Sequence, residues 1–133
     1  MSPRTRHFIR YQLPAIIWAL VIFAASSVPA SRLPRFVFRI NDKLIHASIF
    51  LILGFFVYRA LDLRIRRGSF SWGRAALTVF AVAAYGVLDE IHQIFVPGRT
   101  PDVWDAAADS VGGILSALVL YVIYRGRVTE PSS

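Results

Sequence analysis

The sequence contains no cysteine, which excludes disulfide bonds and thiolate chemistry and leaves no clue to the redox compartment. Charge is also scarce: only 17% of the 133 residues are charged, whereas 56% are hydrophobic. With this composition, a water-soluble domain of 133 residues would have too little polar surface. The composition therefore indicates a membrane protein. Its net charge of +7 suits contact with anionic lipid headgroups, and no nucleic-acid-binding motif is present.

Charged residues are absent from long stretches of the chain. The run from Tyr11 to Ser31 contains none, and its length matches the roughly 20 residues that a helix needs to cross the hydrocarbon core. We expect an all-α fold, an integral membrane bundle of four transmembrane helices in one domain covering 1–133. The predicted spans are about 11–28, 44–61, 75–96 and 104–124, with a disordered tail at 128–133.

The N-terminal segment has a second interpretation. A basic start, an apolar core and small residues before Ala30 resemble a signal peptide that is cleaved after Ala30. The rest of the chain is as apolar as this segment, which favours a retained membrane anchor.

Positive charge is distributed unevenly over the predicted loops. Lysine and arginine collect in cytoplasmic loops. If both termini are cytoplasmic, ten of these residues lie inside and five outside. The sequence therefore predicts a multi-pass protein of the cell membrane with a cytoplasmic N-terminus and a cytoplasmic C-terminus. The five outside residues are Arg32, Arg35, Arg39, Lys43 and Arg99.

Polar residues gather where this orientation places the outer ends of the second, third and fourth spans. Each span has an uncharged run of only about 15 residues, so its outer turn comes from the charged segment. Charged groups in lipid cost about 2.5 kcal/mol or more at the centre, so these side chains should face one another or a water-filled pocket. They are Asp42, Lys43, His46, Asp89, Glu90, His92, Gln93, Arg99, Asp105 and Asp109.

Three roles are open for these residues. Carboxylates and histidines crowded in a partly dry pocket shift one another's pKa values, which makes them candidate acids and bases. The catalytic candidates are Asp42, His46, Asp89, Glu90 and His92. The candidate ligand-binding residues are Lys43, Gln93, Arg99, Asp105 and Asp109. Arg99 either pairs with a nearby carboxylate or binds a phosphate or carboxylate of a ligand. The third role is a hydrogen-bonded network that only locks the helix ends together.

A metal site is not predicted, although the residue types permit one. His46 and His92 with neighbouring carboxylates are a usable ligand set for zinc or a harder divalent ion. The two histidines lie on different predicted helices, and no HExxH motif is present. A divalent metal cofactor therefore stays open. There is no evident Ser/His/Asp triad, but Ser26 and Ser27 at the outer end of the first span could reach the pocket.

The PGRTPD stretch predicts a turn between the third and fourth spans. Pro97 and Gly98 end one helix, Thr100 caps the next, Pro101 takes its first position and Asp102 lies near its positive end. Small residues then follow Asp105 and Asp109 at helical spacing, which lets helices approach closely and turns the acidic face of the fourth span toward the bundle interior. They are Gly112, Gly113, Ser116 and Ala117.

Three motifs give the sequence a resemblance to a known family. DKLIH (Asp42–His46), DEIHQIFVPGR (Asp89–Arg99) and DAAADSVGG (Asp105–Gly113), in this order between hydrophobic spans, resemble the VanZ-like family of small bacterial membrane proteins. The likeness covers about Ala15 to Tyr124. It implies that the family's characteristic positions here are Asp42, Lys43, His46, Glu90, Gln93, Arg99, Asp105 and Gly112. At Asp109 the family often carries asparagine, so this chain is more negative there.

The family takes its name from a protein associated with resistance to the glycopeptide antibiotic teicoplanin. The resemblance therefore implies a role in the bacterial cell envelope, with an outer-leaflet site that binds an envelope or lipid-linked ligand. Two alternatives come from the residues themselves: a membrane-embedded hydrolase or transferase, and a structural or small transport component. The expected partners are the lipid bilayer and a lipid-linked or cell-wall ligand, with no nucleic acid. Whether the protein is an enzyme stays open.

Overall fold

The computed structural model describes residues 1–34, 41–62 and 69–128, with side chains described up to residue 125. The predicted fold class is confirmed, because every regular element within these residues is helical. Four helical segments are long and apolar enough to cross a membrane: Pro3–Ser26, Asp42–Ala60, Trp72–Gln93 and Val103–Arg125. Val128 is still helical, and the rest of the predicted disordered tail, 129–133, lies outside the described residues.

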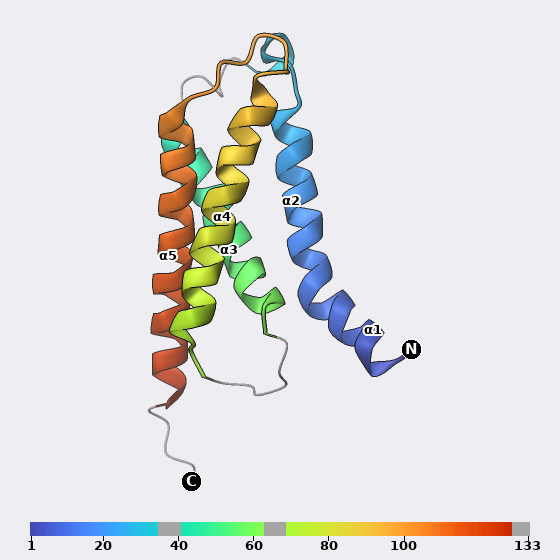
Figure 1. The fold of residues 1–133 in the computed structure, drawn as a ribbon, viewed down its shortest axis with the longest axis vertical. Helices are drawn as coiled ribbons and strands as arrows, with labels where there is room; N and C mark the ends of the chain where they lie inside the picture. The colour runs from blue at the N-terminus through green and yellow to red at the C-terminus, as the bar shows by residue number, and fades with distance from the viewer. Residues whose placement is uncertain (35–40, 63–68, 129–133) are drawn as a thin grey trace.

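The first span consists of three consecutive helical pieces. α1 (Pro3–His7) begins at the cap residue Ser2 and continues through a π-helical turn (Phe8–Gln12) into α2 (Leu13–Ser26). A π-helical turn between two α-helical segments interrupts the regular hydrogen bonding and bends the helix axis. Figure 1 shows the resulting change of direction between α1 and α2. A short 3₁₀-helix, Ala30–Arg32, follows the turn after α2.

The other three spans begin at capping side chains. Asn41 accepts a hydrogen bond from the Lys43 amide and starts α3 (Asp42–Ala60). Ser71 Oγ accepts a hydrogen bond from the Arg74 amide and starts α4 (Trp72–Gln93) three residues earlier than predicted. The helix also ends three residues earlier than predicted, at Gln93. The prediction that Thr100 caps the last helix is wrong. Asp102 accepts from the Trp104 amide at 2.8 Å, so α5 runs from Val103 to Val128.

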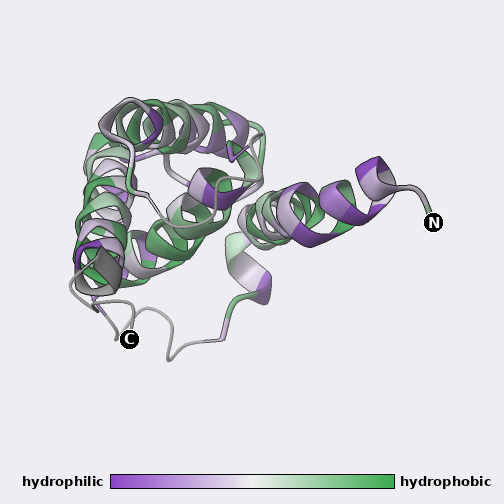
Figure 2. Ribbon diagram, turned by 90° about the horizontal axis from the view of Figure 1, so that it is seen from below, coloured by the Kyte–Doolittle hydropathy of each residue, from purple (hydrophilic) through white to green (hydrophobic). Residues whose placement is uncertain are grey.

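Three of the spans form a close group, and the first lies beside it. Figure 1 shows α3, α4 and α5 side by side, with the start of α1 and the end of α5 at one end. Viewed along the bundle, α2 stands to one side of this group (Figure 2). A β-carbon on Gly112 of α5 would lie 2.5 Å from the carbonyl oxygen of Ala47, so glycine is required for the contact with α3. This close approach agrees with the small-residue pattern in the sequence.

The apolar side chains divide between an interior and an outer surface. One core cluster joins Ile22, Phe50, Leu53 and Val82, and a second joins Tyr58, Ala75 and Leu120. Large apolar side chains also face outward on the spans, as expected where lipid replaces water as the surroundings. Examples are Leu20, Ile52, Phe80 and Val122. The chain is a multi-pass membrane protein.

The up-and-down path fixes which helix ends meet. The end of α2, the start of α3, the end of α4 and the start of α5 lie at the same end of the bundle, opposite the termini (Figure 1). We call this the polar end, because it carries the polar residues that the sequence singles out.

Candidate functional site

The polar end buries several ionisable groups. Asp89, Glu90, Gln93, Asp105 and Asp109 are all less than a tenth exposed. They come from α4 and α5, and α3 adds Lys43 and His46. Buried carboxylates require partners, and the contacts fall into three groups: an ion-paired cluster at the surface, an acidic centre, and a set of bonds to α2.

Lys43 makes the ion-paired cluster. Its ammonium lies 2.6 Å from Asp102 Oδ2, contacts Asp105 Oδ1 and lies 3.8 Å from Asp42 Oδ2. The hydrogen bond from Lys43 holds the pKa of the Asp102 carboxyl below its usual value, since it stabilises the charged form. These contacts join the start of α3 to the start of α5.

His46, Asp109 and Glu90 form the acidic centre. His46 Nδ1 lies 2.8 Å from Asp109 Oδ1, and its Nε2 lies 3.7 Å from Asp105 Oδ2. Glu90 Oε2 accepts a 2.7 Å hydrogen bond from the Asp102 amide. The other two oxygens, Glu90 Oε1 and Asp109 Oδ2, are buried without a hydrogen-bond partner in the described part of the chain.

Bonds to α2 complete the polar end. The Ser26 hydroxyl donates to Asp89 Oδ1 at 2.6 Å, and the Gln93 amide donates to Asp89 Oδ2 at 3.3 Å. Ser27 Oγ lies 2.8 Å from His92 Nε2. Both serines thus bind side chains of α4. Of the two that the sequence suggested could reach the pocket, Ser26 lines the cavity described below, whereas Ser27 is not among its lining residues.

Arg99 contacts backbone rather than a carboxylate. Its Nε donates to the carbonyl of Val28 at 3.0 Å, and its Nη2 donates to the carbonyl of Ala25 at 3.3 Å. The residues that the structure describes show no ion pair for Arg99. The first of its two predicted roles, an ion pair with a nearby carboxylate such as Glu90, Asp102 or Asp105, is therefore not seen among the described residues. The guanidinium instead binds one carbonyl in the last turn of α2 and one just after that helix, and these two bonds use only part of its five N–H donors.

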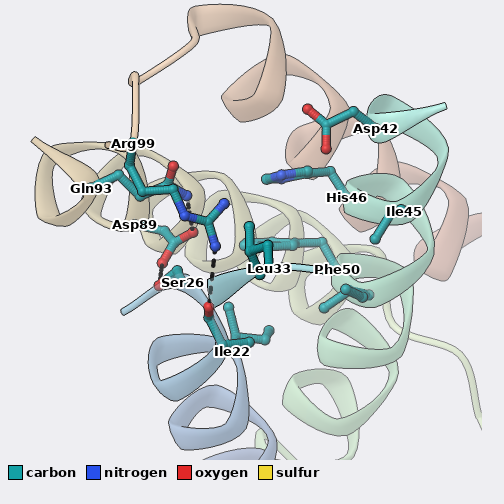
Figure 3. A pocket seen from close by; sticks show the side chains of 12 residues that line it. Ile22, Ser26, Leu33, Asp42, Ile45, His46, Phe50, Asp89, Gln93 and Arg99 are labelled. Atoms are coloured by element: carbon teal, nitrogen blue, oxygen red, sulfur yellow. Dashed lines mark hydrogen bonds between the residues drawn. The ribbon is translucent and has the colours of Figure 1, made fainter. Parts of the chain in front are cut away.

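A cavity of about 200 Å³ lies between α2, α3 and α4. Polar side chains from the polar end line it together with apolar ones. The polar residues are Ser26, Asp42, His46, Asp89, Gln93 and Arg99, and the apolar residues are Ile22, Ala25, Leu33, Ile45, Ile49 and Phe50. Figure 3 shows Arg99, Gln93 and Asp89 on one side, and Asp42 and His46 on the other. The cavity therefore has a polar and an apolar lining.

The structure separates the predicted site residues into two environments. Asp42, His46, Asp89, Gln93 and Arg99 line the cavity. The remaining predicted residues lie in the polar contacts beside it: Lys43, Glu90, His92, Asp105 and Asp109.

The apolar lining was missed from the sequence. Ile49 and Phe50 follow His46 by three and four residues, so the helical period could have placed all three on one face.

Two groups of side chains have the spacing of a metal site. One contains Asp42, His46 and Asp105, and the other contains His46, Glu90 and Asp109. Within each group the donor atoms lie within 4.8 Å of one another. The second group is the more deeply buried, because Glu90 and Asp109 are both buried while Asp42 is exposed.

Comparisons with known proteins support the sequence resemblance. The model of the VanZ/LLP1 family matches residues 11–124, a range that contains all the predicted site residues. An uncharacterized protein of the fission yeast Schizosaccharomyces pombe is 35% identical over 134 residues, covering 98% of this chain and 75% of that protein. No solved structure matches the chain. The likeness thus extends to a fungal protein, beyond the bacteria that the resemblance suggested.

Proposed function

This chain belongs to the VanZ/LLP1 family, and on that premise we propose that it is a multi-pass protein of the cell membrane that binds a phosphate-bearing lipid at its polar end. The cavity holds the headgroup and the first part of the chain. The rest of the lipid stays in the bilayer.

The lining of the cavity carries this proposal. Apolar side chains such as Ile49 and Phe50 suit a hydrocarbon chain, while the Arg99 guanidinium suits a phosphate. Asp42 is exposed and suits a hydroxyl or ammonium group of the same headgroup. The volume, about 200 Å³, is below the roughly 300 Å³ of sites that enclose a whole drug-sized molecule. Only part of a lipid fits inside.

We propose the predicted orientation for the membrane. The end with the termini carries more of the described positive charge than the polar end, which favours a cytoplasmic position for the termini. The described residues at that end are Arg4, Arg6, Arg10, Arg59, Arg74 and Arg125, against Arg32, Lys43 and Arg99 at the polar end. The cavity then opens toward the outer leaflet.

A role in the cell envelope, including glycopeptide resistance, belongs to this proposal through the family name. The fungal relative favours a ligand that bacterial and fungal membranes share, such as a phospholipid, over one found only in bacterial walls. If the bound lipid takes part in wall assembly, expression of the protein in a susceptible bacterium should change the susceptibility of that bacterium to teicoplanin. If the bound lipid has no part in wall assembly, the susceptibility should stay the same.

The binding proposal is tested by matched single-chain lipids. A lipid with a phosphate headgroup should raise the unfolding temperature of the detergent-solubilised protein more than a glucoside with the same alkyl chain, because a ligand that binds only the folded state stabilises it. Arg99→Gln should remove this difference, whereas Arg32→Gln, outside the cavity lining, should keep it. Equal shifts for both lipids in the unaltered protein contradict phosphate recognition.

A lipid hydrolase or transferase is the second candidate, and one contact favours it. His46 lines the cavity while its Nδ1 lies 2.8 Å from Asp109 Oδ1. A carboxylate that orients an imidazole is a common arrangement for a general base. An enzyme of this kind would cleave the bound phospholipid, and His46→Gln would abolish turnover while lipid binding persists. Binding without any product formation leaves the binding function alone.

A further inference from the structure

Two buried oxygens at the polar end require an explanation. Glu90 Oε1 and Asp109 Oδ2 have no hydrogen-bond partner in the described part of the chain, and their residues are 8% and 0% exposed. A carboxylate oxygen that loses water without gaining a donor or a cation is costly. A bound cation would satisfy both oxygens.

The surrounding charges show what is missing. Lys43 already pairs with Asp102 and Asp105, and Asp89 is satisfied by Ser26 and Gln93. Neither Glu90 nor Asp109 has a lysine or arginine partner among the described residues. One dication would balance both carboxylates.

The geometry points to a divalent metal ion bound by His46, Glu90 and Asp109, and we propose this site as a feature that goes beyond lipid binding. The three side chains come from α3, α4 and α5, and their donor atoms lie within 4.8 Å of one another. Each ligand atom lies about 2.0–2.2 Å from a zinc ion, so donors on one ion are roughly 3–4.4 Å apart. The upper limit of 4.8 Å lies close to this range, so the three donors could share one ion after a small approach.

The neighbouring contacts hold the ligands in place. The Asp102 amide binds Glu90 Oε2 and leaves Oε1 available for the ion. Asp105 Oδ2 lies 3.7 Å from His46 Nε2, where a carboxylate can orient a ligating imidazole. Gly86 provides space for the Asp109 carboxylate, because a β-carbon there would lie 2.8 Å from Asp109 Oδ2.

The donor set selects the class of ion. One imidazole nitrogen and two carboxylate oxygens suit Zn²⁺ or Mn²⁺, whereas Ca²⁺ and Mg²⁺ prefer oxygen ligands alone. Copper(I) and iron–sulfur sites need soft sulfur ligands, and the sequence has no cysteine. The donor set therefore favours a first-row transition ion such as Zn²⁺ or Mn²⁺ over Mg²⁺ and Ca²⁺.

The experiment uses the full-length protein, purified in detergent and stripped with a chelator. Titration with Zn²⁺, Mn²⁺, Mg²⁺ or Ca²⁺ is followed by elemental mass spectrometry after desalting and by the unfolding temperature. We expect one equivalent of Zn²⁺ or Mn²⁺ per chain and a rise in unfolding temperature, with no such effect of Mg²⁺ or Ca²⁺. Failure of the unaltered protein to take up either ion overturns the proposal, whatever the variants do.

Variants locate the ion. His46→Gln and Glu90→Gln should weaken binding at least tenfold, since loss of even an indirect contact to a metal ligand costs 10- to 100-fold. Asp109→Asn keeps an oxygen donor but loses the charge, so a smaller loss is expected. The matched control is Asp89→Asn, which alters a neighbouring carboxylate that is equally buried but already hydrogen-bonded. An equal loss of affinity in Asp89→Asn would overturn the assignment to these three residues.

The metal and lipid proposals fail separately. Arg99→Gln should reduce the preference for phosphate lipids and leave the uptake of Zn²⁺ or Mn²⁺ unchanged, because the Arg99 side chain hydrogen-bonds only to the carbonyls of Ala25 and Val28 among the described residues. Loss of metal uptake in this variant would contradict a site built from α3, α4 and α5.

Discussion

Gly86 of α4 lies directly against Asp109 of α5. A β-carbon at position 86 would lie 2.8 Å from both Cβ and Oδ2 of Asp109. The missing side chain of one helix therefore creates the space for a buried carboxylate on the next. The acidic centre of the polar end depends on this contact as much as on the acidic residues themselves.

Gly86→Ala should destabilise the protein by about 1–3 kcal/mol, because overpacking forces Asp109 or the helices to move. The measurement is unfolding of the detergent-solubilised protein, by heat or by a denaturing detergent.

The control for this change is Gly73→Ala in the first turn of the same helix. Only Ser71 Oγ, at 3.9 Å, lies near a β-carbon at position 73. Alanine there should be neutral or stabilise the helix by up to about 1 kcal/mol. Equal destabilisation by both alanines would contradict the close contact between Gly86 and Asp109.

Ser26→Ala should destabilise the protein because it removes the hydrogen bond to Asp89 Oδ1 and leaves that buried oxygen without a donor. The expected cost is about 1–3 kcal/mol. Ser110→Ala is the matched control, since the Ser110 hydroxyl only donates to the carbonyl of Ala106 in its own helix. A loss in Ser26→Ala no larger than in Ser110→Ala would show that the contact between α2 and α4 contributes little.

The sequence predicted four spans because long apolar stretches with few charges have few alternatives to a membrane-spanning helix. Their limits were less accurate, since local hydrogen bonds set them. Ser71 caps α4 and starts it earlier than predicted. Asp102, rather than Thr100, accepts the hydrogen bond that caps α5. The predicted gathering of polar residues at one end followed from the alternating direction of the spans.

The partners within the site could not be predicted in the same way. Helical spacing shows which residues share a face but does not show what the next helix presents to them. Arg99 was therefore predicted either to pair with a carboxylate or to bind a ligand, and its bonds to the carbonyls of Ala25 and Val28 were not foreseen. The apolar lining of the cavity was missed for a similar reason, because Ile22 and Leu33 meet Ile49 only through the tertiary packing of the first two spans.

The orientation is tested with single cysteines, which label cleanly because the chain has none of its own. Thr100→Cys places a thiol on the exposed loop of the polar end, and Gly73→Cys places one at the opposite end. In intact cells a membrane-impermeant maleimide should label the first variant, and it should label the second only after permeabilisation. The reverse pattern would contradict a cytoplasmic position of the termini.

Lipid occupancy of the cavity tests the central claim most directly. Native mass spectrometry of the protein released from mild detergent should show a bound phospholipid, and Ala25→Phe should remove it by filling the cavity that Ala25 lines. Ala24→Phe introduces the same side chain one residue away, outside the lining, and should retain the lipid. Loss of the lipid only in Ala25→Phe is the predicted result; a lipid that stays bound in both variants, or no bound phospholipid in the unaltered protein, would contradict a lipid site at the polar end.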